Sequence, residues 1–286
     1  MLNKRARYPL AGLIFSTSLA GCVYDAPSRD DVEYLTDDSL PSHTIYQPAD
    51  LDGIETPLPV VAWGVGGCTL PGVSVGVFLA EITAAGYLVV SNNSPWSTFP
   101  TSSDMLIETL DWAEIQNADP DSPYFRKLDT ENVALMGHSC GGLEALHAGA
   151  GDPRVDTVIA LGSGIFDSGG LGGATKDDLL TLPNTLWMNG GPEDIAYPQA
   201  ESDYAEVPDY VSVVWANYDL SERGSGLFGA HNGTLNDEAG GEYARASILW
   251  LDWHLKGINA NQSQFMQDTC GLCATDSKWS VQSKNW

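Results

Sequence analysis

Positively charged residues are scarce in this sequence. Its 286 residues include 13 Lys and Arg against 38 Asp and Glu, which gives a formal net charge of −25. Such a surface repels the phosphates of nucleic acids and the headgroups of anionic membranes. The composition therefore excludes a nucleic-acid partner and disfavours polyanionic substrates. The acidic residues are spread along the chain, which favours a highly soluble surface over a local site for a cationic partner.

The body of the chain also lacks any apolar run long enough to span a bilayer, and it has no internal repeat. A short apolar stretch occurs only at the N-terminus, from Pro9 to Leu19, after three basic residues within the first seven. It ends in Leu19-Ala20-Gly21-Cys22. A basic start, a short apolar stretch and a small-residue end are typical of a secretory signal. We therefore predict that residues 1–21 are a signal peptide.

The end of this signal resembles a bacterial lipobox, in which a cysteine receives lipid and the preceding peptide is removed. This resemblance makes Cys22 the lipidated first residue of the mature chain, and Val23 after it favours the outer membrane. The alternative is an ordinary signal peptidase site that lies beside a cysteine. We expect an exported bacterial lipoprotein of the outer membrane or cell surface, or alternatively a secreted protein.

Cysteine is rare, with five residues in the chain. Once Cys22 is set aside, Cys68, Cys140, Cys270 and Cys273 remain, and an even number in an exported protein predicts disulfides. The C-x-x-C pair at 270–273 has no further ligands at zinc spacing, and it lacks the βαβ context of a thioredoxin-like motif. We therefore predict a Cys270–Cys273 disulfide and a Cys68–Cys140 disulfide. Two buried free thiols are the alternative for the second pair.

Two regions follow the signal. Residues 22–41 are acidic and poor in apolar residues, so we predict a flexible tether that cannot offset its ordering entropy by burial. Residues 42–286 are predicted to form one catalytic domain, in which apolar strands alternate with helices. Strands are expected at 43–46, 58–63, 87–91, 132–136, 155–161, 186–188 and 210–215, and helices at 73–85, 102–116, 141–148 and 242–255.

Alternating apolar strands and helices predict an α/β fold with a mostly parallel central sheet and helices on both faces. About twenty residues separate the strand at 155–161 from the strand at 186–188, and this stretch includes Gly169, Gly170, Gly172 and Gly173. This segment is too short for a large lid. We therefore expect a minimal lid or none, and an open site.

The motif Gly137-His138-Ser139-Cys140-Gly141 lies between a predicted strand and a predicted helix. A tight turn in that position lifts a serine hydroxyl above the sheet edge, and glycine is needed on both sides because larger residues would clash. We therefore predict that Ser139 is a nucleophile. The alternative is a glycine-rich turn with a helix-capping serine. The G-x-G-x-x-G spacing of dinucleotide sites is absent.

A serine hydroxyl needs a base, and the base is oriented by an acid. In this arrangement the acid and the histidine follow the serine along the chain. His231 lies in a glycine-rich loop after the strand at 210–215, so we predict that it is the base. Asp194 follows the strand at 186–188 and is the predicted acid, with Glu193 as the alternative.

Three stretches resemble secreted α/β-hydrolases of the dienelactone-hydrolase and cutinase or polyester-hydrolase type. They are Trp63-Gly64-Val65-Gly66-Gly67-Cys68, the segment from Gly137 to Gly142, and Asp194-Ile195-Ala196-Tyr197-Pro198. The resemblance covers most of residues 43–257 and implies the α/β-hydrolase fold. It also implies that an oxyanion hole is formed by backbone N–H groups of Gly67 and Cys140, with Gly66 or Cys68 as alternatives to Gly67. The predicted Cys68–Cys140 disulfide would then flank both donors.

We therefore expect a serine hydrolase that cleaves carboxylic esters through an acyl-enzyme, with no cofactor and no metal. Trp96, Ile195 and Tyr197 are predicted to line the substrate cleft, which suits an aromatic or polymeric ester. Within enzymes, the alternatives are a lipase, a phospholipid acyl hydrolase or an amidase. Outside them, the alternative is a non-catalytic, surface-anchored binding protein on the same fold. We expect a monomer that touches a membrane only through its N-terminal lipid.

Overall fold

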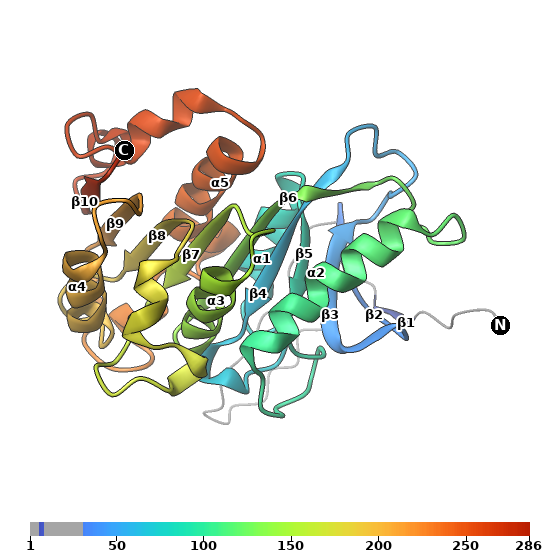
Figure 1. The fold of residues 1–286 in the computed structure, drawn as a ribbon, viewed down its shortest axis with the longest axis horizontal. Helices are drawn as coiled ribbons and strands as arrows, with labels where there is room; N and C mark the ends of the chain where they lie inside the picture. Colours follow the sequence, from blue (N-terminus) through green and yellow to red (C-terminus); the bar gives the residue numbers. More distant parts are fainter. Residues whose placement is uncertain (1–5, 9–30) are drawn as a thin grey trace.

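The computed structural model describes residues 6–8 and 31–286, and it contains one twisted sheet between layers of helices (Figure 1). The order of the strands is β1-β2-β3-β5-β4-β6-β7-β8-β9-β10. Their bounds are Ala6–Tyr8, Val32–Asp37, Leu40–Pro48, Leu58–Gly64, Leu88–Ser91, Leu128–His138, Thr157–Leu161, Asn184–Asn189, Val213–Tyr218 and Trp279–Lys284 for β1 to β10. The six strands from β5 to β9 in this order pair in parallel, whereas the outer strands pair antiparallel. The predicted α/β class with a mostly parallel sheet is confirmed.

Helices cover both faces of this sheet (Figure 1). The helices α1 to α6 span Gly76–Ala84, Ser103–Ala118, Cys140–Gly151, Tyr197–Glu206, Gly241–Leu255 and Gly271–Thr275. In β4, every residue is buried, and successive side chains point to opposite faces. Val61 and Trp63 belong to the core shared with α1 and α5, whereas Val60 and Ala62 belong to the core shared with α2, α3 and α4. A strand that is buried on both faces is read in the sequence as a continuous apolar run.

The predicted tether at residues 22–41 is wrong in its second half. Val32–Asp37 forms strand β2, which pairs antiparallel with β3. Leu35 is fully buried in this strand, and Glu33 accepts a hydrogen bond from the Gln47 amide nitrogen at 2.7 Å. Val32 and Tyr34 are also buried, so the acidic segment forms a strand by alternating its acidic residues with apolar ones that face the core. The folded domain therefore includes at least residues 31–41 as well.

Most of the predicted signal peptide and Cys22 lie outside the described residues. Strand β1 falls within the predicted signal and pairs with β2, so it would be absent from a processed chain. In the part of the chain that the structure describes, no helix is both long and apolar enough to cross a bilayer.

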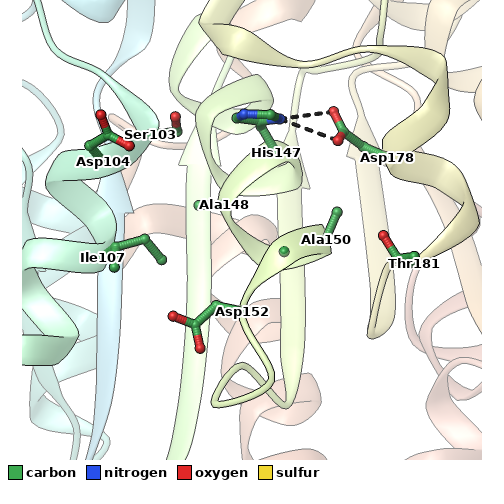
Figure 2. Close-up of a pocket in the computed structure, with 10 residues that line it drawn as sticks. Ser103, Asp104, Ile107, His147, Ala148, Ala150, Asp152, Asp178 and Thr181 are labelled. Atoms are coloured by element: carbon green, nitrogen blue, oxygen red, sulfur yellow. Dashed lines mark hydrogen bonds and ion pairs between the residues drawn. The ribbon is translucent and has the colours of Figure 1, made fainter.

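The segment between β7 and β8 folds onto α3. It contains two short 3-10 helices, η2 at Leu171–Gly173 and η3 at Lys176–Leu180. His147 of α3 donates through Nδ1 to the Asp178 carboxylate at 3.1 Å, which fastens η3 to that helix (Figure 2). A cavity of about 380 Å³ opens beside this pair, between α2 and α3.

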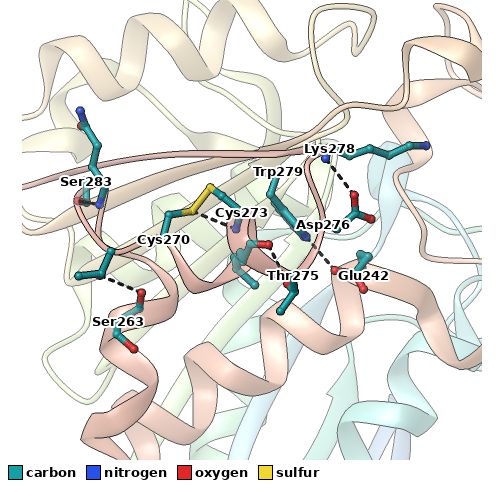
Figure 3. The surroundings of a disulfide bond; sticks show 12 residues. Glu242, Ser263, Cys270, Cys273, Thr275, Asp276, Lys278, Trp279 and Ser283 are labelled. Atoms are coloured by element: carbon teal, nitrogen blue, oxygen red, sulfur yellow. Dashed lines mark hydrogen bonds between the residues drawn. A yellow bond between two sulfur atoms is a disulfide. The ribbon is translucent and has the colours of Figure 1, made fainter.

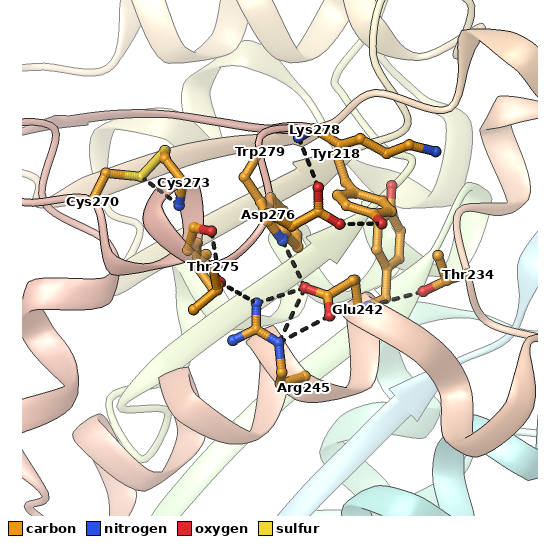
Figure 4. A network of polar contacts seen from close by, with 12 residues as sticks. Tyr218, Thr234, Glu242, Arg245, Cys270, Cys273, Thr275, Asp276, Lys278 and Trp279 are labelled. Atoms are coloured by element: carbon orange, nitrogen blue, oxygen red, sulfur yellow. Dashed lines mark hydrogen bonds and ion pairs between the residues drawn. A yellow bond between two sulfur atoms is a disulfide. The ribbon is translucent and has the colours of Figure 1, made fainter.

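The C-terminal segment adds strand β10, which the sequence pattern did not predict. Cys270 and Cys273 form a disulfide at the start of α6, which confirms the predicted pair (Figure 3). The indole of Trp279 donates to Glu242 of α5 at 2.8 Å, and Tyr218 donates to Asp276 at 2.8 Å (Figure 4). These bonds hold the segment against α5 and β9, at the opposite end of the sheet from β1 and β2.

Candidate active site

Ser139 occupies a strained turn between β6 and α3. Its φ of 55° and ψ of −121° are uncommon for a residue with a side chain. The turn is possible because glycines surround it: a Cβ on Gly137 would lie 2.2 Å from the Gly141 carbonyl oxygen, and a Cβ on Gly141 would lie 2.1 Å from the Gly64 carbonyl oxygen. The flanking glycines therefore allow β4 and the start of α3 to approach each other closely, as the motif predicts.

The predicted base and acid lie beside this serine. His231 lies in the 3-10 helix η5, Ala230–Asn232, and its Nε2 is 2.9 Å from the Ser139 Oγ. Its Nδ1 is 2.7 Å from Asp194 Oδ1. A carboxylate only accepts hydrogen bonds, so Nδ1 carries the proton and Nε2 is free to accept from the hydroxyl. Both His231 and Asp194 are buried.

Asp194 is held in place by donors from its own loop. Its Oδ2 accepts from the Asn189 side-chain amide and from the Gly190 N–H, each at 3.1 Å. Its Oδ1 also accepts from the Ala196 N–H at 2.9 Å. The alternative acid, Glu193, is exposed to solvent and has no place in this chain of bonds. The structure therefore brings Asp194, and not Glu193, to the histidine.

His138 is a fourth member of the site that sequence reasoning did not single out. Its Nε2 donates to the His231 backbone carbonyl at 2.9 Å, and the two rings lie 4.9 Å apart. Burial, with a smaller contribution from His231, lowers the pKa of His138 to about 4. The ring is therefore neutral near pH 7, and it fixes the backbone that carries His231. Its position next to the nucleophile in the motif was the available signal.

The predicted oxyanion donors lie on the other side of Ser139. Gly67 belongs to the 3-10 helix η1, Gly66–Cys68, and both Gly67 and Cys140 border the cavity that contains Ser139. The Cys68 N–H donates to the Val65 carbonyl at 3.3 Å. Among the described residues, no backbone hydrogen bond uses the N–H of Gly67 or of Cys140. These two groups are available to a ligand, and the positive end of the α3 dipole lies beside Cys140.

The predicted Cys68–Cys140 disulfide is confirmed, with the two Cα atoms 5.3 Å apart. It joins η1 to the first residue of α3. The cross-link therefore connects the two backbone segments that carry the candidate donors.

The cavity over Ser139 has a volume of about 270 Å³ and a mostly apolar lining. Its large apolar side chains are Leu143, Phe166, Leu171, Ile195 and Leu227. Ile195 was predicted there, whereas the other two predicted cleft residues are not part of the lining. Trp96 is 60 % exposed and is not among the residues that line this cavity. Tyr197 begins α4 and packs its ring 4.9 Å from that of Trp215, because the helix turns this side chain towards the sheet.

The larger cavity of Figure 2 lies away from Ser139 and contains none of the three candidate catalytic side chains. Over residues 6–8 and 31–286, no group of three or more His, Cys, Asp or Glu side chains is arranged to hold a metal ion. No protein-family model matches this chain, and no curated protein matches it. The candidate site therefore rests on its own geometry.

Proposed function

We propose that this protein is a serine hydrolase that cleaves carboxylic esters through an acyl-enzyme on Ser139. The observation that supports this most is the continuous chain of hydrogen bonds from Ser139 through His231 to Asp194, at 2.9 Å and 2.7 Å, beside an apolar cavity. A nucleophile, a base within hydrogen-bond reach and an acid that orients the base are the requirements of acyl transfer. The α/β-hydrolase identity and the likeness to polyester hydrolases belong to the same proposal.

The proposed reaction has two steps. His231 Nε2 takes the proton of the Ser139 hydroxyl as its oxygen attacks the ester carbonyl, and Asp194 stabilises the imidazolium that forms. The tetrahedral oxyanion accepts from the N–H groups of Gly67 and Cys140, and the alcohol leaves with the proton from His231. Water then attacks the acyl-enzyme by the same route. One oxyanion donor contributes roughly 3–4 kcal/mol in comparable enzymes.

The cavity indicates an uncharged acyl group of limited size. Its volume of about 270 Å³ lies just below the usual range of small-molecule sites, about 300–1,000 Å³. Its lining is mostly apolar and contains no Lys or Arg, so an anionic acyl group would lose its hydration without a cationic partner. Phe166 and Leu227 also reach the surface, at 43 % and 59 % exposure, so the rest of a larger ester would lie along an apolar rim.

The N-terminal pattern supports an exported lipoprotein whose lipid is carried by Cys22. In that case, the ester substrate is met outside the cytoplasm, where both disulfides persist. Incorporation of labelled palmitate into the wild-type chain, and its loss in Cys22→Ser, would test this assignment.

The central test is covalent labelling by a fluorophosphonate probe together with hydrolysis of p-nitrophenyl esters of increasing chain length. We expect labelling and turnover in the wild type, and neither in Ser139→Ala, because no other group would accept the probe. Ser280→Ala, an exposed serine on β10, is the matched control and should behave as the wild type. Absence of labelling and of ester turnover in folded wild-type protein would refute the enzyme assignment. A rate that grows with long chains would favour the lipase alternative.

A further inference from the structure

The loop that carries Gly67 has an unfavourable backbone of its own. Gly67 and Cys68 both have positive φ values, 62° and 52°. A non-glycine residue with positive φ is costly and persists only when its surroundings hold it. The position of the Gly67 N–H therefore depends on contacts made by the ends of the loop, at Val65 and Cys68.

A side-chain network ties both ends of this loop to one residue of α3. The Val65 N–H donates to Asn92 Oδ1 at 3.0 Å, and the Asn92 amide nitrogen donates to Glu144 Oε2 at 2.8 Å. At the other end, the Thr101 N–H donates to the Cys68 carbonyl at 2.8 Å. The Thr101 hydroxyl in turn donates to Glu144 Oε1 at 2.8 Å. The two carboxylate oxygens of Glu144 are thus connected, one through Asn92 and one through Thr101, to the two ends of the segment that contains Gly67.

Glu144 is an unusual residue to find in this position. Its relative exposure is 0 %, and burial raises its pKa above the ordinary value. In the described part of the chain, no Lys or Arg forms an ion pair with it. Burying an acidic side chain without a cationic partner costs free energy, and hydrogen bonds to its carboxyl group offset part of this cost. The side chains that donate to its carboxylate, Asn92 and Thr101, belong to the two residues that reach the loop.

We propose that Glu144 is a positioning residue for the oxyanion hole, acting through Asn92 and Thr101 on the loop that carries Gly67. This inference rests on the proposed function, since the hole matters only if Ser139 forms a tetrahedral intermediate. Glu144 lies one helical turn after Cys140 in α3. The same helix therefore carries the Cys140 donor and the residue that holds the loop of the Gly67 donor. The Cys68–Cys140 disulfide is a second, covalent tie between the same two segments.

The mildest test is Thr101→Val, which removes the hydroxyl bond to Glu144 and keeps the backbone bond to Cys68. We expect kcat to fall about 3–10-fold with KM unchanged, because a displaced oxyanion donor acts on the transition state, and full loss of one donor costs about 10²–10³-fold. Thr109→Val is the matched control: this buried threonine of α2 bonds only within its helix, to the Met105 carbonyl. The control should keep the wild-type kcat.

Glu144→Ala should lower kcat further, by about 10–100-fold, and Glu144→Gln should remain within about 3-fold of the wild type. The glutamine oxygen can accept from Asn92 while its amide group donates to the Thr101 hydroxyl, which is able to turn and accept. If Glu144→Gln were as slow as Glu144→Ala, hydrogen-bonded positioning would be wrong.

Two further readouts separate positioning from general damage to the fold. An alkylboronic acid forms a tetrahedral adduct with the serine, so its affinity should fall by the same factor as kcat/KM in Thr101→Val. The pH at which the rate is half-maximal should not move, because the His231–Asp194 pair is untouched. A Thr101→Val or Glu144→Ala enzyme with a full fluorophosphonate titre and unchanged boronate affinity would overturn the proposal.

Hydrogen–deuterium exchange tests the same inference without turnover. Peptides that cover residues 64–70 should exchange faster in Glu144→Ala than in the wild type, while peptides from α2 keep their rate. If the wild type neither reacts with the probe nor hydrolyses esters, the proposed function is wrong. The exchange rates of residues 64–70 would then still test whether Glu144 holds the loop in place. Equal exchange in both proteins would refute the role of Glu144 whatever the activity.

Discussion

The two disulfides should differ strongly in what they contribute to stability. Cross-linking lowers the entropy of the unfolded chain in proportion to the logarithm of the enclosed loop. Cys68 and Cys140 are 72 residues apart, which corresponds to about 4 kcal/mol at 25 °C. Cys270 and Cys273 are 3 residues apart, which corresponds to only about 1–2 kcal/mol. Replacing the first pair by alanines should lower the melting temperature by roughly 8–16 °C, at about 2–4 °C per kcal/mol.

The assay is urea unfolding, followed by circular dichroism, of the wild type and of the two double-alanine variants. The free energy of unfolding in water is the quantity to compare, because removing a cross-link also expands the unfolded state and raises the dependence on urea. The variant without the C-terminal disulfide is the control for loss of two half-buried sulfurs. Equal destabilisation of the two variants, or a loss below about 1 kcal/mol for the Cys68–Cys140 pair, would refute the loop-entropy reasoning.

Two further predictions concern specificity and acid stability. Leu171→Ala should enlarge the cavity and lengthen the preferred acyl chain by about two to four carbons, which corresponds to the side-chain volume removed. A kcat/KM series of p-nitrophenyl esters measures this shift. Leu180 is half-exposed and lies outside the cavity lining, so Leu180→Ala should leave the preference unchanged. Burial lowers the pKa of both His138 and His254 from 6.5 to about 4. Each histidine therefore contributes about 3 kcal/mol to the free energy of unfolding. This contribution is present above pH 6.5 and is lost as the pH falls towards 4. Burial raises the pKa of Asp203 to about 6, so protonation of this carboxyl stabilises the fold as the pH falls, opposite to the histidines. The His254→Gln variant leaves Asp203 unchanged, and its difference from the wild type therefore gives the contribution of His254 alone. Urea unfolding at pH 7.5 and 4.5 should show a smaller acid-induced loss in His254→Gln, and an unchanged loss would contradict the assignment.

Much of the fold could be predicted because its central strands are buried on both faces. Runs such as 58–63 and 133–136 are continuously apolar, and the structure has strands there. The missed elements lie at the periphery, where burial is one-sided. Strand β10 alternates buried and exposed residues at its start, and α4 buries only Ala200 and Asp203. Strand β2 was mistaken for a tether because the whole segment at residues 22–41 contains six acidic residues, although Val32, Tyr34 and Leu35 of the strand are buried.

The candidate triad could be predicted because its members follow a fixed order and each one follows a strand. Glu144 could not, because an acidic residue in a helix is normally a solvent-facing residue. Its burial depends on Asn92 and Thr101, which lie 52 and 43 residues earlier in the chain. Tyr197 was misplaced for a related reason. Its neighbour in sequence lines the cavity, but the start of α4 rotates the tyrosine towards Trp215.

The loop at Gly66–Cys68 explains why two separate ties are found at one place. Glycine loses more conformational freedom on folding than any other residue, and the positive φ of Cys68 adds a cost of about 1–3 kcal/mol. Within the loop, the Cys68 N–H donates to the Val65 carbonyl at 3.3 Å and the Thr69 N–H donates to the Gly66 carbonyl at 3.4 Å, whereas the Gly67 N–H makes no backbone hydrogen bond to the described residues. A donor that is left unpaired can be kept in place only by its neighbours. The disulfide constrains the loop at Cys68, and the Glu144 network constrains it at Val65 and again at Cys68. Under the proposed function, the oxyanion requires a free Gly67 N–H, and this requirement accounts for a buried Glu144 that no Lys or Arg of the described residues neutralises.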